Sequence, residues 1–136
     1  MTHMPEDVQV LEFRLGSNEY CIDIEYIEEV VELGGNGLTD LPNSASYIEG
    51  VMDLRGDTTT IVNPKKLLDV GAEEDGDRII VLEQNGGSDD VVGWQVDEVN
   101  EVSTVDPDSV DTPTGDDNMI NGVINKEEEF VIWVEP

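Results

Sequence analysis

The stretch Tyr47–Asp53, with the sequence YIEGVMD, decides the fold because it recurs as Met119–Asn125, MINGVIN, at a displacement of 72 residues. The same displacement places the run IVNP, which ends at Pro64, on the run WVEP, which ends at Pro136. It also places Ile24, Ile27 and Val30 on Val96, Val99 and Val102, and Glu29 on Glu101. Three separate matches at one displacement indicate two copies of one small unit. Because each copy is too small to be stable alone, the two should pack into one cooperative body.

Alternating apolar residues predict that each unit is built of strands. Between Val8 and Ile24, apolar side chains recur at every second position on both sides of Gly16-Ser17-Asn18, which predicts a hairpin. The second copy has the same pattern with a longer loop, Asn85–Asp90, in its hairpin. The other predicted strand segments are Arg78–Leu82, Val91–Trp94, Ile61–Val62 and Phe130–Val134.

One short helix is predicted at Pro64–Val70. Asn63 can cap its start, proline is favoured in a first helical turn, and Gly71 can end it. Many short strands with Gly and Pro turns are typical of a barrel or a sandwich. We therefore expect an all-β fold, with a flexible tail over residues 1–7, a first β-barrel subdomain over 8–77 and a second over 78–136.

The composition excludes several classes of partner. The chain has 6 Lys and Arg against 33 Asp and Glu, and its net charge of -27 repels nucleic acid and anionic lipid. Carboxylates spread through every segment are typical of a halophile's surface, so we expect a halophilic archaeon as the source. No apolar run approaches the length of a membrane span, which argues against membrane insertion. Cys21 is the sole cysteine, which fits a reducing, cytoplasmic compartment.

The chain offers little that could carry catalysis or hold a metal. His3, the only histidine, lies in a polar tail, and Cys21 lies in an apolar run without a nearby imidazole, so a buried core thiol is expected. No Cys and His cluster is present for zinc, and the acidic run that begins at Asp106 fails the EF-hand pattern because Val110 takes a ligand position. We expect a binding protein without catalytic residues, metal or cofactor.

Arg55 is the most unusual charged residue. It stands between Leu54 and Gly56, and no other Lys or Arg occurs between Arg14 and Arg55. It could form an internal ion pair, or its planar guanidinium could pair with a partner's carboxylate. The second copy has Asn125-Lys126-Glu127-Glu128 at the corresponding place, so the unit does not need the Leu-Arg-Gly turn. This asymmetry favours a partner contact. Gly50 and Gly122, in contrast, recur in both copies, which predicts a bulge or a close backbone approach at each.

Several motifs together resemble the CheW family of chemotaxis proteins, over nearly the whole chain from Val8 to Pro136. The family pattern reads approximately F-x-L-G, Y-x-I-D-I, E-V/I, L-P, I-x-G-V-x-N-L-R-G and V-G-x-x-V-D-x-V. The matching segments here are Phe13–Gly16, Tyr20–Ile24, Ile27–Val30, Leu41-Pro42, Tyr47–Gly56 and Val92–Val99. The chain departs from the pattern at Asp53, where Asn is usual, at Thr60–Pro64, and at Pro136, beyond which many relatives continue into a helix.

The resemblance implies an adaptor without catalytic activity, made of two five-stranded Src-homology-3-like barrels. Such a protein couples chemoreceptor signalling tips to the regulatory domain of the histidine kinase CheA, in cytoplasmic arrays at the membrane. The family residues implicated in coupling correspond to Ile27, Glu29, Gly50, Arg55 and Val102. Ile27 and Val102 could instead be core, and Glu29 could pair internally with Arg55. A CheW-like regulatory domain from a larger kinase would have a similar sequence.

The extreme charge generates the first prediction. Multimolar salt shortens the Debye length to about 3 Å and quenches the repulsion between carboxylates. We expect the chain to lose its fold in about 0.1 M KCl and to keep it in about 3 M KCl. Thermal melts followed by circular dichroism test this, and an unchanged midpoint between the two conditions would contradict it.

Overall fold

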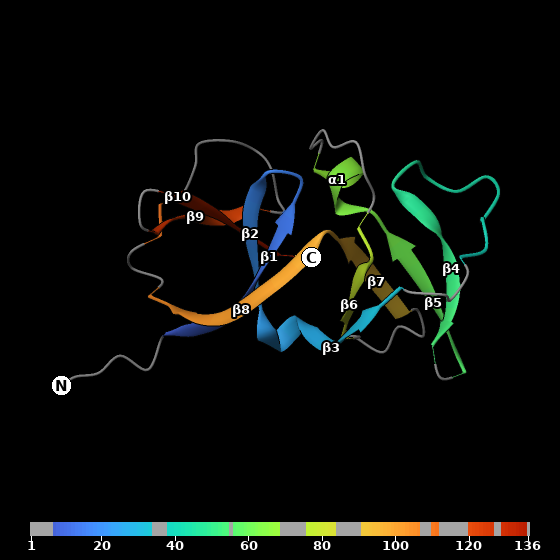
Figure 1. Ribbon diagram of the computed structural model, residues 1–136, viewed down its shortest axis with the longest axis horizontal. Coiled ribbons are helices and arrows are strands. Elements are labelled where there is room, and N and C mark those ends of the chain that lie inside the picture. Colours follow the sequence, from blue (N-terminus) through green and yellow to red (C-terminus); the bar gives the residue numbers. More distant parts are fainter. Residues whose placement is uncertain are drawn as a thin grey trace.

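Ten strands, one 3-10 turn and one short α-helix form the part of the chain that the computed structural model describes, residues 7–33, 38–54, 56–68, 76–83, 91–106, 110–111, 120–126 and 129–135 (Figure 1). In chain order they are β1 (Val8–Leu15), β2 (Asn18–Asp23), η1 (Ile24–Tyr26), β3 (Ile27–Glu32), β4 (Ile48–Leu54), β5 (Asp57–Val62), α1 (Pro64–Leu67), β6 (Arg78–Leu82), β7 (Val91–Val96), β8 (Glu98–Val105), β9 (Ile120–Lys126) and β10 (Glu129–Val134). None of the helices described is long and apolar enough to cross a membrane.

The predicted hairpins are confirmed, and the helix is shorter than expected. β1 pairs with β2, and β6 pairs with β7, each in antiparallel register. Asn63 caps α1, since its Oδ1 accepts a hydrogen bond from the Lys65 backbone N–H at 3.0 Å. The helix ends at Leu67, and the expected terminal residues Val70 and Gly71 lie outside the described residues.

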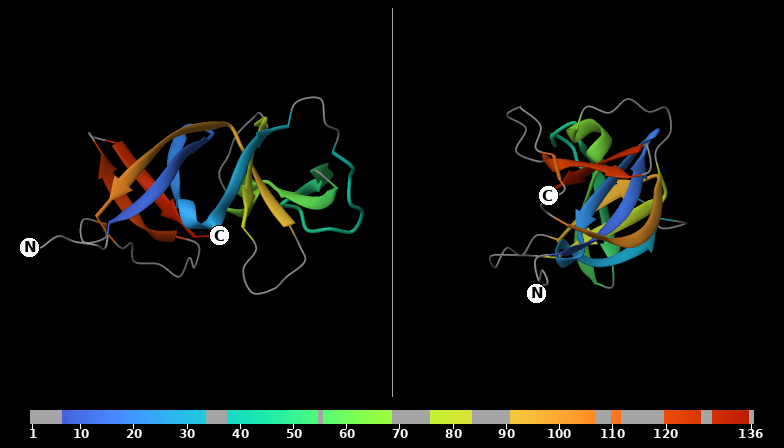
Figure 2. Two further views of the ribbon diagram at one scale, coloured as in Figure 1. Left: turned by 90° about the horizontal axis from the view of Figure 1, so that it is seen from below. Right: turned by 90° about the vertical axis from the view of Figure 1, so that its left-hand side faces the viewer.

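The strands form two five-stranded sheets, which confirms the all-β class. The first sheet has the order β8-β1-β2-β10-β9 and the second has the order β3-β6-β7-β5-β4. Each sheet therefore combines the first hairpin of one copy with the last three strands of the other: β1 and β2 join β8, β9 and β10 in the first sheet, and β6 and β7 join β3, β4 and β5 in the second (Figure 2). The expected division at residues 77 and 78 separates the two sequence copies, but it does not separate the two sheets. Of the expected tail, residues 1–7, all but Asp7 lie outside the described part of the chain.

The internal repeat is confirmed by the positions of the strands. β4 and β9 begin 72 residues apart, as do the isolated bridges Thr39–Val51 and Asp111–Val123. In both copies the last strand also runs parallel to the second strand of a hairpin, β5 beside β7 and β10 beside β2. The same pairing rules thus build both sheets.

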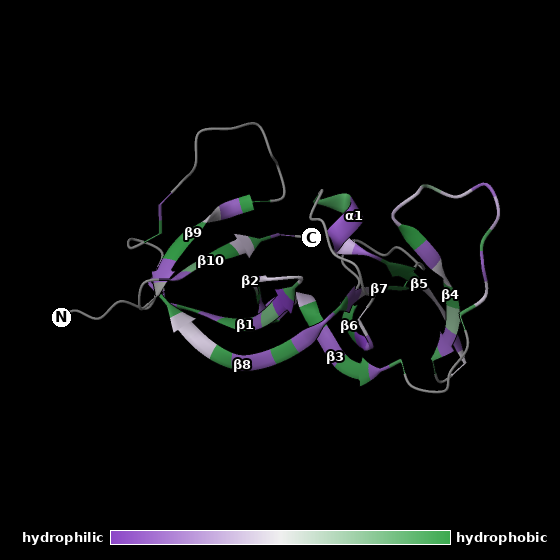
Figure 3. Cartoon of the chain, turned by 45° about the horizontal axis from the view of Figure 1, so that its top comes forward, coloured by the Kyte–Doolittle hydropathy of each residue, from purple (hydrophilic) through white to green (hydrophobic). Residues whose placement is uncertain are grey.

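Three apolar clusters hold the sheets together. The largest lies between them and draws on both, with Phe13, Leu15 and Ile22 from the first sheet and Ile80 and Trp94 from the second. Each sheet also curls around a smaller core of its own. β1 consequently buries both of its faces, because Leu11, Phe13 and Leu15 reach the shared core while Val10 enters the core of the first sheet. Apolar residues are interspersed with polar ones along strands such as β8 (Figure 3).

Asp97, at the point where the chain passes from β7 to β8, links the two sheets. Its Oδ1 accepts a hydrogen bond from Lys65 Nζ at 2.7 Å, and its Oδ2 accepts one from the Gly16 N–H in the β1–β2 turn at 2.6 Å. The Lys65 side chain is 5% exposed. α1, which lies beside the second sheet, is thereby tied to a turn of the first sheet.

Substitution of Lys65 should test this link. Lys65→Met leaves the Asp97 carboxylate without its buried cation, so the free energy of unfolding should fall by about 3 kcal/mol. The neighbouring Lys66 provides the matched control, because it also pairs with a carboxylate, that of Glu49, but its side chain is 49% exposed. Lys66→Met should cost less than about 1 kcal/mol. Chemical denaturation of both variants in the same high salt gives the comparison, and equal losses would contradict the assignment.

Candidate functional site

The structure brings one predicted site residue, Glu29, to the turn that carries another. A hollow of about 60 Å³ is lined by Glu29 of β3 together with Leu54 and Asp57, which flank the β4–β5 turn. β3 and β4 are the two edges of the second sheet, so its curling is what makes them neighbours. Arg55 itself lies outside the described residues, and its partner contact stays a prediction.

The turn around Arg55 is closed by a side chain. The Gly56 N–H donates a hydrogen bond to Asp53 Oδ1 at 2.8 Å. Asp53 stands where the resembled family usually has Asn, and a carboxylate oxygen supplies the same acceptor as an amide oxygen. The substitution therefore preserves the local bond of the turn.

Ile27 is half-buried and packs against the shared core, so it is neither wholly surface nor wholly core. It directly follows Tyr26, whose hydroxyl donates a hydrogen bond to Glu135 Oε1 at 2.8 Å. This bond to a carboxylate raises the pKa of Tyr26, and partial burial adds to the shift. The bond also ties the start of β3 to the residue that follows β10.

Val102 lies on the surface, and the alternative that it is core is wrong. Its side chain is 53% exposed on β8, where it pairs with Leu11 of β1. Val30, which the repeat places on Val102, is likewise exposed, at 39%, on β3. Val30 was not among the predicted site residues, although the 72-residue displacement pairs it with Val102. β3 and β8, the third strands of the two copies, thus each present one exposed valine to solvent.

Gly50 is buried and has a structural reason to be glycine. Its φ of +151° is rarely adopted by other residues, and a Cβ at this position would lie 2.5 Å from the Thr39 carbonyl oxygen. The β4–β5 register shifts between Ile48 and Gly50, and the β9–β10 register shifts at the matching place beside Gly122. The predicted bulge is confirmed at both glycines and the close backbone approach at Gly50, whereas a Cβ at Gly122 would first meet the Val110 side chain. A direct part for Gly50 in a partner contact stays a prediction.

The predicted site residues therefore do not form one cluster. Ile27, Glu29 and Gly50 belong to the second sheet, and Val102 belongs to the first. In Figure 1, β3 and β8 lie on different sheets, so a partner that touched both Val30 and Val102 would have to span the two sheets.

The positive charges of the described part of the chain are already engaged. Each of the four cationic side chains described there is within 4.0 Å of a carboxylate: Arg14 with Glu98, Lys65 with Asp97, Lys66 with Glu49, and Arg78 with Asp77 and Glu32. No group of three or more His, Cys, Asp or Glu in the described ranges is arranged to hold a metal ion. The chemistry available at this surface is apolar contact and charge pairing.

Comparison with known proteins gives consistent matches. The model of the CheW-like domain family matches residues 9–136. The chain is 26% identical over 133 residues to the chemotaxis protein CheW of Thermotoga maritima, covering 96% of this chain and 85% of that protein. It is 33% identical over 106 residues to the chemotaxis protein CheW of Rhizobium meliloti, covering 77% of this chain and 66% of that protein. The crystal structure of the scaffolding protein TtCheW from Thermoanaerobacter tengcongensis is similar with a TM-score of 0.82 and 27% identity, over 95% of this chain and 89% of that one.

Glycine substitutions test the structural role of Gly50. Gly50→Ala should lower the free energy of unfolding by about 2–4 kcal/mol, because the new Cβ displaces the Thr39 carbonyl as well as straining the backbone. Gly56→Ala is the matched control: its φ is +88°, but the position of its Cβ is open, so a loss of about 1 kcal/mol is expected. Denaturant melts give both values. A Gly50→Ala chain as stable as Gly56→Ala would contradict the structural role.

Proposed function

The chain belongs to the CheW-like domain family, and from this membership we propose that it is a chemotaxis adaptor that couples transmembrane chemoreceptors to the histidine kinase CheA. The adaptor acts by binding and performs no reaction. It works in the cytoplasm and is recruited to receptor arrays at the membrane. The all-β architecture and the similarity to a scaffolding protein support this role.

The observation that carries the proposal is the exposure of Val30 on β3 and of Val102 on β8, at matching places in the two copies. A receptor signalling tip, which is helical, presents apolar side chains at helical spacing and can lay them against such residues. Glu29 and the turn that bears Arg55 lie together at the edge of the second sheet and supply the charged part of the contact. Ile27 and Gly50 hold β3 and β4 in place from within.

Affinity and register have different sources in this proposal. With a net charge of -27, the adaptor operates best in the high salt that a halophilic archaeon supplies. Salt at that level screens exposed charge pairs, so the apolar contact carries most of the affinity. The Arg55 guanidinium then selects the orientation of the partner by pairing with one of its carboxylates.

Binding assays distinguish the adaptor from a regulatory domain that belongs to a larger kinase. The full chain, in multimolar KCl, is presented to a receptor signalling-tip fragment and to a CheA regulatory domain in separate pull-downs. An adaptor binds both partners and brings them into one complex. Retention of neither partner would remove the adaptor proposal, and a sequence continuous with kinase domains in the genome would favour the alternative.

Two substitutions test the contact residues. Arg55→Glu and Val102→Asp should each weaken binding of the receptor fragment by about tenfold or more, because one inverts the selecting charge and the other places a carboxylate in the apolar contact. Both should leave the free energy of unfolding within about 0.5 kcal/mol, as the proposal that each side chain contacts only the partner requires. Lys66→Glu changes the net charge as much as Arg55→Glu does and should leave receptor binding unchanged. A matching loss of stability in Arg55→Glu would instead indicate an internal ion pair.

A further inference from the structure

The two crossings between the sheets carry side-chain bonds that the adaptor proposal does not use. Among the described strands, the chain passes from one sheet to the other twice, from β2 to β3 through η1 and from β7 to β8 through Asp97. Parallel pairing places the end of β10 beside the end of β2, and the end of β5 beside the end of β7. The residues that follow β10 and β5 therefore lie close to the two crossings.

At each crossing, one such residue is bonded to a side chain of the crossing. After β5, Lys65 Nζ donates a hydrogen bond to Asp97 Oδ1 at 2.7 Å, and Asp97 Oδ2 accepts one from the Gly16 N–H of the first sheet. After β10, Glu135 Oε1 accepts a hydrogen bond from the Tyr26 hydroxyl at 2.8 Å. We call these two links the Lys65–Asp97 clasp and the Tyr26–Glu135 clasp.

The two clasps occupy the same place in the unit but are built from different residues. The 72-residue displacement places Tyr26 on Glu98 and Glu25 on Asp97, so it does not carry one clasp onto the other. The repeat pattern alone therefore accounts for neither clasp. Each crossing is nevertheless held to the segment that follows the neighbouring parallel strand, once by a buried ion pair and once by a hydroxyl.

The clasps add direction to a contact that is otherwise apolar. The core shared by the sheets consists of apolar side chains, and burial of such surface stabilises the contact without preferring one direction. Hydrogen bonds, in contrast, weaken steeply when their angles depart far from linear. The Lys65 side chain is 5% exposed, so salt screens its pair with Asp97 much less than it screens a surface pair. The clasps are thus suited to fix the angle between the sheets in high salt.

A strand of the proposed contact surface begins directly after each crossing. β3 begins one residue after Tyr26, and β8 begins one residue after Asp97. Val30 lies four residues beyond Tyr26 and Val102 lies five beyond Asp97, within about 17 Å along an extended strand. A strand that is held in its ladder carries the direction set at its first residue to the exposed valine.

We propose that the two clasps set the angle between the sheets, and that this angle places Val30 and Val102 where one helical partner contacts both. The clasp residues are positioning residues, because they act through β3 and β8 and do not touch the partner. The inference rests on the proposed adaptor function. Apolar contact requires heavy atoms to approach within about 4.5 Å, so a partner that spans both sheets loses one contact when the sheets turn. The clasps arrange the surface before binding, which reduces the cost of ordering it.

The orientation of the sheets can be measured without any partner. The full chain, in KCl that keeps it folded, is aligned in a stretched polyacrylamide gel, and residual dipolar couplings of the backbone amides are recorded. One alignment tensor should fit the couplings of both sheets in the native chain. In Tyr26→Phe, which removes only the hydroxyl, each sheet should still fit alone, whereas a common fit at the native angle should fail.

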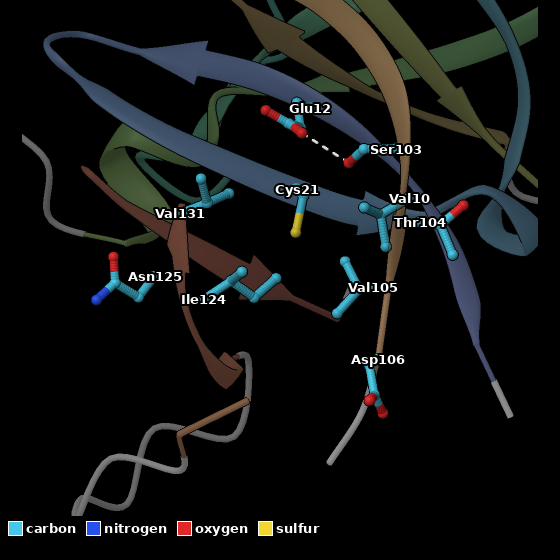
Figure 4. A pocket seen from close by; sticks show the side chains of 10 residues that line it. All are labelled: Val10, Glu12, Cys21, Ser103, Thr104, Val105, Asp106, Ile124, Asn125 and Val131. Carbon is cyan, nitrogen blue, oxygen red and sulfur yellow. Dashed lines mark hydrogen bonds between the residues drawn. The ribbon is translucent and has the colours of Figure 1, made fainter. Parts of the chain in front are cut away.

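Ser103→Ala is the matched control for this measurement. The Ser103 hydroxyl also donates a hydrogen bond to a carboxylate, Glu12 Oε2 at 2.6 Å, but both residues belong to the first sheet (Figure 4). Its removal should leave the angle between the sheets at the native value. Glu135→Ala should act as Tyr26→Phe does, and the double variant should change the angle no more than either single variant, because both remove the same bond.

Asp97→Asn tests the other clasp with a change of few atoms. An amide offers one acceptor oxygen where a carboxylate offers two, so the hydrogen bond from Lys65 or the one from Gly16 is lost. The angle between the sheets should change in this variant as well.

Binding of the receptor signalling-tip fragment provides the second readout. Tyr26→Phe and Asp97→Asn should each weaken it by about fivefold, while Ser103→Ala should bind as tightly as the native chain. The assays are run in KCl at which denaturant melts show every variant to be fully folded, so a loss of stability alone does not change them.

Two results would overturn the inference. One is a native angle between the sheets in both Tyr26→Phe and Asp97→Asn, and the other is a changed angle with native affinity for the receptor fragment. A native chain that binds no receptor fragment would remove the adaptor proposal and, with it, the placement of the two valines. The couplings would still decide, in that case, whether the clasps set the angle.

Discussion

The apolar core shared by the two sheets is the constraint on which the rest of the structure depends. Each copy of the repeat contributes strands to both sheets, because the hairpins β1–β2 and β6–β7 are exchanged between the copies. β1 and β2 bury side chains on both faces, one toward the shared core and one toward the core of the first sheet. Neither sheet can therefore form completely before the other half of the chain is present, and the repeat folds as one body.

Positive charge is used sparingly and in two different ways. Lys65 lies almost wholly within the protein and joins Asp97 across the boundary between the sheets. The other cationic side chains that the structure describes pair with carboxylates at or near the surface, in contacts that salt screens. A chain with few cations has thus placed one of them where a low dielectric makes it effective, which leaves the surface strongly negative.

The two copies diverge at a few positions, and these positions separate fold from function. Gly50 and Gly122 are retained because a Cβ would clash with a neighbour at both, with the Thr39 carbonyl at Gly50 and with the Val110 side chain at Gly122. The Leu-Arg-Gly turn occurs in the first copy only. An internal repeat thus supplies its own comparison, since whatever both copies keep is needed by the unit and whatever one copy changes is free to serve another purpose.

The sequence by itself determined the all-β class, the two-fold repeat, both hairpins, the cap at Asn63 and the special backbone at Gly50, because alternation, turn residues and glycine conformation are properties of neighbouring residues. It could not determine the exchange of the β1–β2 and β6–β7 hairpins, the exposure of Val102, or the approach of Glu29 to the turn beside Leu54. The alternation of side chains along β1 assigns each residue to one of two faces of the strand, but it does not reveal that both faces are buried. These features depend on which distant strands pair and how far each sheet curls, so only the tertiary structure decided them.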